Sequence, residues 1–380
     1  MAAILQEVRF LESMDNLKPR VKLRFGREPS TGVAREIVGC LLQGRLFYEA
    51  AANSPLEIRP LQMFYGMVGF AKALIVASRC MSLSTLRGAR GLKDVSDGGC
   101  RIADLRVRIT DAGTFHEFND VVAAWTRLCC FDGVRSYGVS TPAAMAVKLC
   151  GLDLSLRELL SRVPELEDLY GKTFGEPANT AQFIVENDCE ACSIRIDHPG
   201  TFANLEELKT IVSRWRLRFP FLAPWRLVAA QHVGAYSAIH FQNTSSQNID
   251  EFAEPFLNAP NSPLQAAFHN IRPEDRFPFR EFLPAMGGGY TDHYPHAIAA
   301  IQGHYISEFA LQYLALFVLS SLVRYRPQTW MHAISRSSTA EAPADDRALS
   351  LIEQFLEVNS RTIPTMIVTM LNPQEDPYSV

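Results

Sequence analysis

Helical periodicity at the two ends of the chain, with a different pattern between them, is the feature that most constrains the fold. Apolar residues recur at helical spacing over about 33–52 and 59–78, and residues 53–55 break the pattern between these segments. The most apolar stretch, 309–323, is too short to span a bilayer and contains Gln312. It therefore predicts a helix buried in a protein core.

The last hundred residues extend this helical pattern. One long helix is expected over about 298–326, and Pro327 should stop it. A polar stretch of small residues follows, and a last helix is expected over about 346–370 with an interruption near Pro364. Helices from both ends are predicted to pack into one bundle, because each has an apolar face that needs a partner.

The middle of the chain reads differently, because glycines cluster there and short alternating runs predict strands. The alternating runs are near 105–109, 183–185, 192–196, 214–219 and 228–241, and residues 100–250 are expected to contribute a sheet. In the run at 214–219, Arg214, Arg216 and Arg218 alternate with Trp215 and Phe219, which would place cations and aromatic rings on opposite faces of a strand. Residues 255–295 predict a long irregular connection, and residues 1–30 predict an arm or a short strand.

These patterns predict an α+β, mainly α fold in which a β-rich insertion interrupts a helical bundle. The expected regions are an N-terminal arm and helical hairpin (1–83), a mixed middle region (84–295) and C-terminal helices that complete the bundle (296–380).

Charge and cysteine usage limit the function classes. The net charge of −4 provides no overall field that would attract nucleic acid or an anionic membrane. The eight cysteines have no disulfide-like spacing, which is typical of a reduced compartment. The first residues carry charges too early for the apolar part of a signal peptide. We therefore expect a cytoplasmic protein that does not enter a membrane.

Two segments resemble the YaaC-like family, which is defined by sequence. The first is the helix with Pro60, Tyr65 and Ala71-Lys72-Ala73, followed by Gly91-Leu92; the second runs from Glu308 to Trp330 and reads EFALQYLALFVLSSLVRYRPQTW. The resemblance implies a fold and a bacterial context, and it implies no particular reaction.

The helix around Tyr65 is also similar to the tyrosine-rich helix of HEPN domains, which are helical bundles that often act as ribonucleases. That resemblance implies a metal-independent ribonuclease in which His332 is the general base and Arg326 stabilises the phosphorane charge. Pro327 departs from the family pattern, since it should break the helix that presents both side chains. The favoured interpretation is a helix end where cations neutralise the last carbonyls and Trp330 packs.

Four residues of the family-like helices form a second candidate site. Tyr65 and Lys72 are seven positions apart and should share a helix face. Packing of the two helices is expected to bring them together with Glu308 and Arg324. Two cations against one carboxylate would leave a positive charge for an anion such as phosphate, and the alternative is a sealed network that fixes helix register.

Metal and cofactor sites are not expected. Cys189 and Cys192 with His198 lack the second ligand pair of a zinc site, and the Pro295 next to His296 rules out helical spacing of ligands there. The leading hypothesis is a binding or effector module for RNA or a protein partner in bacterial stress or anti-phage defence. The alternatives are the metal-independent ribonuclease, which leaves enzymatic activity uncertain, and a structural subunit of a larger complex. A homo-oligomer is compatible with each hypothesis.

Overall fold

The structure is a computed structural model, and it describes residues 2–86, 88–125, 129–131, 137–139, 144–182, 184–188, 191–219, 222–223, 225–242, 296–335 and 348–372. Its helices are α1 (Ala2–Phe10), α2 (Met14–Phe25), α3 (Thr31–Ala52), α4 (Arg59–Arg79), α5 (Thr114–Trp125), α6 (Ala146–Leu149), α7 (Leu156–Leu160), α8 (Glu167–Phe174), α9 (Leu205–Arg218), α10 (Glu308–Tyr325), α11 (Pro327–Ser335) and α12 (Leu349–Leu371). Its strands are β1 (Leu92–Asp94), β2 (Arg106–Ile109), β3 (Cys129–Phe131), β4 (Tyr137–Val139), β5 (Asp153–Ser155), β6 (Thr180–Gln182), β7 (Ile184–Asp188), β8 (Ala191–Pro199), β9 (Arg226–Val233), β10 (Tyr236–Gln242) and β11 (His296–Ile298).

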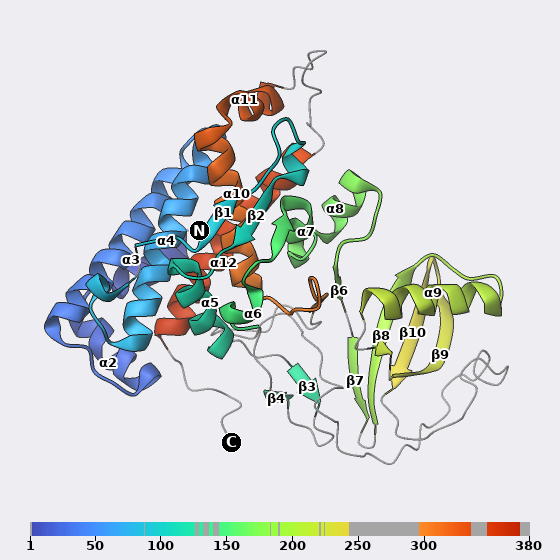
Figure 1. Cartoon of the computed structure of the whole chain (residues 1–380). Coiled ribbons are helices and arrows are strands. Elements are labelled where there is room, and N and C mark those ends of the chain that lie inside the picture. Colours follow the sequence, from blue (N-terminus) through green and yellow to red (C-terminus); the bar gives the residue numbers. More distant parts are fainter. Residues whose placement is uncertain are drawn as a thin grey trace.

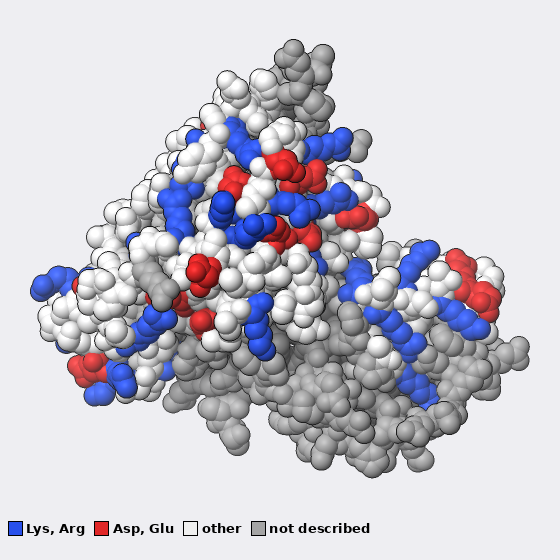
Figure 2. All heavy atoms as spheres, in the orientation of Figure 1, with Lys and Arg blue, Asp and Glu red and all other residues white. Residues whose placement is uncertain are grey.

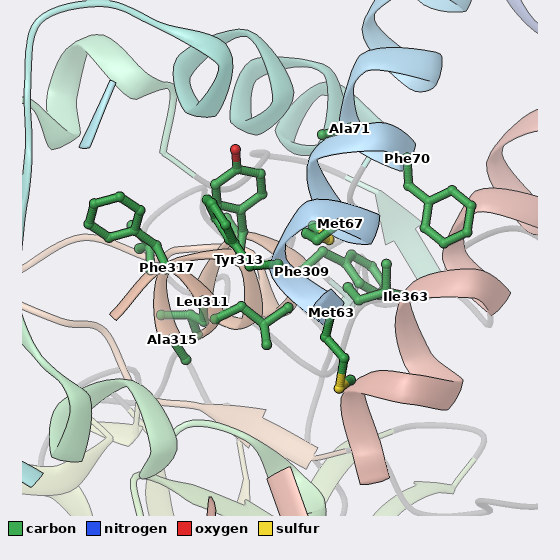
Figure 3. Close-up of a cluster of buried hydrophobic side chains, with 14 of the residues drawn as sticks. Met63, Met67, Phe70, Ala71, Phe309, Leu311, Tyr313, Ala315, Phe317 and Ile363 are labelled. Atoms are coloured by element: carbon green, nitrogen blue, oxygen red, sulfur yellow. The ribbon is translucent and has the colours of Figure 1, made fainter. Parts of the chain in front are cut away.

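Helix α4 lies at the centre of the helical body. It contacts α3 and α5 from the first part of the chain and α10 and α12 from the last part, so the predicted bundle of terminal helices is confirmed. Figure 3 shows Met67 of α4 beside Phe309 of α10, with Ile363 of α12 close by. Helix α10 is buried on all sides from Glu308 to Leu322, as expected for a helix that is apolar around its whole circumference.

Glycines allow α3 and α4 to pack closely. A Cβ atom added to Gly69 would lie 3.0 Å from the Gly44 nitrogen and 3.1 Å from the Cys40 carbonyl oxygen. A Cβ atom on Gly44 would lie 2.4 Å from the ring of Phe70. The helices can approach this closely only because neither glycine has a side chain.

Helix α4 is also long and apolar enough to cross a membrane by length and composition alone, but 67% of its most apolar window is buried inside the structure. It packs as a core helix of the helical body.

A smaller lobe stands beside the helical body (Figure 1). Its antiparallel sheet has the strand order β7-β8-β10-β9, and α9 lies across one face of that sheet. Leu208, Ile211 and Trp215 of α9 pack against Ile196 and Ile239 of the sheet and form a separate hydrophobic core. Pairing of β6 with β11 lies on the connection between the lobe and the body. A three-stranded sheet, β1-β2-β5, packs on the body itself.

Two sequence predictions were wrong because a short alternating run was given more weight than helical spacing. Residues 1–30 form α1 and α2 where an arm or a short strand was expected, and Leu17 and Val21 are buried one helical turn apart. The supposed strand at 214–219 belongs mostly to helix α9, which begins after Asn204; the Asn204 side chain accepts a hydrogen bond from the Glu207 amide.

The helix expected over 298–326 begins only at Glu308, because β11 and a turn at Gln302–Gly303 with positive φ values precede it. Helix α12 continues through Pro364, where an interruption was expected. The predicted irregular connection over 255–295 lies outside the described residues, as does Cys189.

Candidate anion-binding pocket

The middle of α4 is accessible to solvent only along a narrow stripe of its surface. Between Met63 and Ala77, every residue of α4 is buried except Tyr65, Val68 and Lys72, which recur at helical spacing. These three residues line a pocket with a volume of about 280 Å³. The prediction that Tyr65 and Lys72 share one face is therefore confirmed, and that face is accessible to a ligand.

Arg90 and Thr114 complete the polar part of the pocket, and a tight backbone crossing positions both. Thr114 donates its amide hydrogen to the Ala89 carbonyl (3.0 Å), and the following amide donates to the Arg90 carbonyl (3.0 Å). A Cβ atom on Gly113 would lie 2.1 Å from the Gly91 nitrogen, and both glycines have positive φ values. Sequence reasoning missed Arg90 and Thr114; the glycine cluster was the available signal, but it did not indicate which segments cross.

The pocket is positively charged. Its lining includes the cations Lys72 and Arg90, and no carboxylate is among the described residues that line it. The guanidinium of Arg90 lies 5.7 Å from the centre of the Phe64 ring, which is a cation–π contact. Among the described residues, neither Lys72 nor Arg90 forms an ion pair, so the positive charge of the pocket is not compensated there.

Glu36 on α3 is a carboxylate near the pocket, and its oxygens bind groups other than the two cations. Its two oxygens accept hydrogen bonds from the hydroxyl of Ser82 (3.0 Å) and from the amide of Leu83 (2.7 Å). This contact fastens the loop after α4, and Leu83 of that loop lines the pocket. Burial raises the pKa of Cys40 to about 11, and the nearby charge of Lys72 opposes this rise.

Further hydrogen-bonding groups surround the two cations. The Gln43 amide, the Tyr65 hydroxyl and the Thr114 hydroxyl belong to residues of the lining. Thr114 is also the first residue of α5, so the positive end of this helix dipole lies at the pocket. Cations, neutral donors and a helix N-terminus together form the environment in which proteins bind phosphate and carboxylate groups.

The expected convergence of four residues is wrong. Glu308 and Arg324 are sixteen positions apart on α10, which places them about 24 Å apart along the helix axis. Glu308 is fully buried and accepts a hydrogen bond from the Gln312 amide (3.1 Å). Arg324 donates to the Ser320 carbonyl (3.2 Å), and its guanidinium lies over the Tyr325 ring. Only Tyr65 and Lys72 of the four predicted residues share the pocket.

Arg326 and His332 lie on separate elements. Helix α10 ends at Tyr325 and α11 begins at Pro327, so the proline separates the two helices as the sequence predicted. The guanidinium of Arg326 donates to the carbonyl oxygens of Ser96 (2.8 Å) and Asp97 (2.9 Å), and it fixes that loop. His332 is half-buried on α11. Trp330 is buried and donates its indole hydrogen to the Glu57 carbonyl (3.0 Å), as expected of a packing residue.

A larger cleft of about 1140 Å³ separates α8 of the body from α9 of the lobe. The Arg218 side chain donates to the carbonyl oxygens of Ala178 and Thr180 and lies 4.0 Å from the Glu167 carboxylate. Burial raises the pKa of Glu167 to about 7 and lowers that of Arg218 to about 10.

Carboxylates and cations both line this cleft, so the cleft does not specify the charge of a ligand. Glu176 pairs with Arg157 (2.9 Å), and Asp197 pairs with Arg195 (3.1 Å). Lys, Arg, Asp and Glu side chains are interspersed over the body in Figure 2, without a continuous positive track. The described residues contain no cluster of three or more side chains that could hold a metal ion.

Comparison with known proteins gives a family for the chain. Searches of curated proteins and of solved structures found no match. The family model described as YaaC-like Protein matches residues 27–371, which include α3, α4, α5, α10 and nearly all other described elements. The chain therefore belongs to the YaaC-like family.

Proposed function

We propose that this YaaC-like protein is a binding module whose ligand carries a phosphoryl group, and that this group binds between Lys72 and Arg90. The observation that carries the proposal is the lining of the pocket, where two cations face a small volume and no described lining residue supplies a carboxylate. Both cations border the same small volume, so an anion that binds there can interact favourably with each of them.

The chemistry of the two cations suits a phosphoryl group. Arginine presents a planar fork of donors that matches two phosphate oxygens, whereas lysine supplies a compact point charge. The hydroxyl of Thr114 can donate to a remaining oxygen. A carboxylate has fewer oxygens and less charge, so it would leave some of these donors without an acceptor.

A single small pocket is better suited to bind one phosphoryl group than to bind the extended backbone of a nucleic acid. Proteins that bind single-stranded nucleic acid combine an extended positive groove with a series of stacking rings. This pocket is about 280 Å³, and the chain has a net charge of −4. The hypothesis of a binding module is thereby narrowed to a phosphorylated small molecule in place of RNA or a protein partner.

Titration of inorganic phosphate into the full-length protein by calorimetry tests the proposal. Lys72→Gln and Arg90→Gln should each weaken binding by about 10- to 100-fold, because each removes a charge-assisted interaction. Lys93→Gln is the matched control, since Lys93 is exposed on β1 outside the pocket. Equal affinity in the wild-type protein and both pocket variants would refute the proposal.

The metal-independent ribonuclease is the alternative, and a separate assay tests it. The contacts of Arg326 with two backbone carbonyls give that side chain a structural role, so the pocket has more support. Incubation of the purified protein with total RNA and EDTA would show cleavage if the alternative holds, and His332→Ala would abolish that cleavage.

A further inference from the structure

Two aromatic rings lie at one end of the pocket. Tyr65 lines the pocket and is 37% exposed, although the α4 residues on either side of it are buried. Its ring lies 5.6 Å from the ring of Phe47 on α3, measured between centroids, with an angle of 31° between the ring planes. Phe47 is half-buried, so the pair presents an aromatic surface beside the pocket.

The spacing along α4 separates Tyr65 from Lys72. Tyr65 and Lys72 are seven positions apart, which corresponds to about 10 Å along the helix. Val68 lies between them on the same stripe and also lines the pocket, as does Phe64. The pocket thus has Lys72 toward one end and the Tyr65 ring toward the other, and the Arg90 guanidinium lies 5.7 Å from the centre of the Phe64 ring.

The Tyr65 ring packs in part against the rings of Phe47 and Phe64, and the rest of it is exposed at the pocket. Exposing an aromatic ring on an otherwise buried helix sacrifices hydrophobic stabilisation, and the ring could have been packed or replaced by a polar residue. Neither Phe47 nor Tyr65 is needed to hold Arg90, because the Gly91–Gly113 crossing does so. A ligand that covers the Tyr65 ring while its phosphoryl group reaches Lys72 would account for both ends.

We propose that the ligand is a phosphate monoester that carries an aromatic ring, as a nucleoside monophosphate does. Its phosphoryl group binds Lys72 and Arg90, and its ring stacks on Tyr65 beside Phe47. This inference rests on the proposed function, because it extends the same pocket toward its aromatic end.

The experiment compares three ligands that differ by one part each: inorganic phosphate, ribose 5-phosphate and AMP. With the full-length wild-type protein, AMP should bind on the order of 10-fold more tightly than ribose 5-phosphate, because only AMP has a base to stack. Tyr65→Ala should remove most of that difference, and Tyr65→Phe should retain it, because the phenylalanine ring offers the same stacking face. Tyr325→Ala is the matched control, since Tyr325 is an exposed aromatic residue on α10 outside the pocket.

The outcomes distinguish failure of this inference from failure of the proposed function. If wild-type protein binds none of the three ligands, the proposed function fails and the inference fails with it. If inorganic phosphate binds but AMP binds no more tightly than ribose 5-phosphate, only the inference is overturned. Leu42 and Leu46 are exposed on α3, so anionic lipid vesicles form a further arm; binding to vesicles without binding to AMP would also overturn it. Circular dichroism of Tyr65→Ala checks that this variant is folded.

Discussion

Helix α4 has a sealed polar network on one side and an open polar pocket on the other. In the sealed network, Tyr48 donates to Asn359 (2.8 Å), Asn359 donates to Gln312 (3.0 Å), and Gln312 donates to Glu308 (3.1 Å). All four side chains are buried, and burial raises the pKa of Tyr48 well above its ordinary value. In the open pocket, Tyr65, Lys72 and Arg90 reach solvent, and no carboxylate of the described lining faces the two cations.

The difference shows what makes a polar group in an apolar helix structural or functional. A buried donor needs an acceptor from the protein itself; α3 and α12 each supply one member of the sealed chain and α10 supplies two. In the open pocket the neighbouring helices leave a stripe uncovered, so water or a ligand can supply the partner. Lys72 and Glu308 looked alike in the sequence, as charged residues in apolar helices, and the surrounding elements give them opposite roles.

The largest effect on stability is expected from breaking the sealed network. Asn359→Leu removes the acceptor of the Tyr48 hydroxyl and the donor to the Gln312 carbonyl, and leaves both groups buried. The free energy of unfolding should fall by about 2–4 kcal/mol, because each orphaned group costs about 1–3 kcal/mol. Urea denaturation measures this loss. Affinity for phosphate should be unchanged; a parallel loss of affinity would show that the two polar sites are coupled.

In the open pocket, a substitution should change the affinity for phosphate and leave the stability of the ligand-free protein unchanged. At a phosphate concentration of 100 times Kd, binding should stabilise the wild-type protein by about 2.7 kcal/mol. Lys72→Met should abolish most of this stabilisation without lowering stability in the absence of phosphate, since no described ion pair is broken. Thermal denaturation with phosphate, and with chloride at equal ionic strength, measures the effect. A variant that is destabilised without ligand would mean that Lys72 has a structural role like that of Asn359.

Helices α3 and α4 pack closely between the two sites. A methyl group added where these helices cross should weaken their packing and lower the stability of the protein. Gly69→Ala places a Cβ atom 3.0–3.1 Å from backbone atoms of Gly44 and Cys40, which cannot move as a flexible side chain would. The expected loss of stability is about 1–3 kcal/mol, as for other overpacked cores. Gly39→Ala is the control on the same helix pair, because a Cβ atom there meets nothing within 4 Å. Similar stability of both variants would mean that α3 shifts at little cost.

The parts of this architecture that were predictable from sequence depend on local spacing. The bundle, the shared face of Tyr65 and Lys72, and the break at Pro327 follow from a helical period of 3.6 residues and from proline geometry. The same spacing could have shown that Glu308 and Arg324 lie too far apart to meet, since both were expected on one helix. The buried stripe of Leu208, Ile211 and Trp215 likewise outweighs the short alternation at 214–219.

Other parts depend on contacts between distant segments. Arg90 enters the pocket because Gly91 packs against Gly113, and nothing in the spacing of either glycine indicates that its partner is the other one. The partners of Glu308 and of Asn359 are likewise set by tertiary packing. A site formed in this way becomes visible only when the fold brings the segments together.

Glu167 is half-buried between the body and the lobe, so its exposure is intermediate between that of the sealed network and that of the open pocket. Its substitution should have the smallest effect on stability. Burial raises its pKa from 4.5 to about 7; the charge of Asp168 raises it further, whereas Arg218 and the Thr180 hydroxyl oppose the rise. Since the folded state then holds this proton more tightly than the unfolded state, the contribution to stability is present below pH 4.5 and is lost as the pH rises to about 7. The effect should be small, because the carboxylate is 36% exposed and solvent screens it.

Glu167→Gln tests this expectation, because glutamine does not titrate. Urea denaturation at a series of pH values between 4.5 and 7 should show a stability that falls less with pH in the variant than in the wild-type protein. Glu353→Gln, which removes an exposed carboxylate of α12, should follow the wild-type profile. Identical profiles for all three proteins would contradict this expectation and show that Glu167 is well solvated in the folded state.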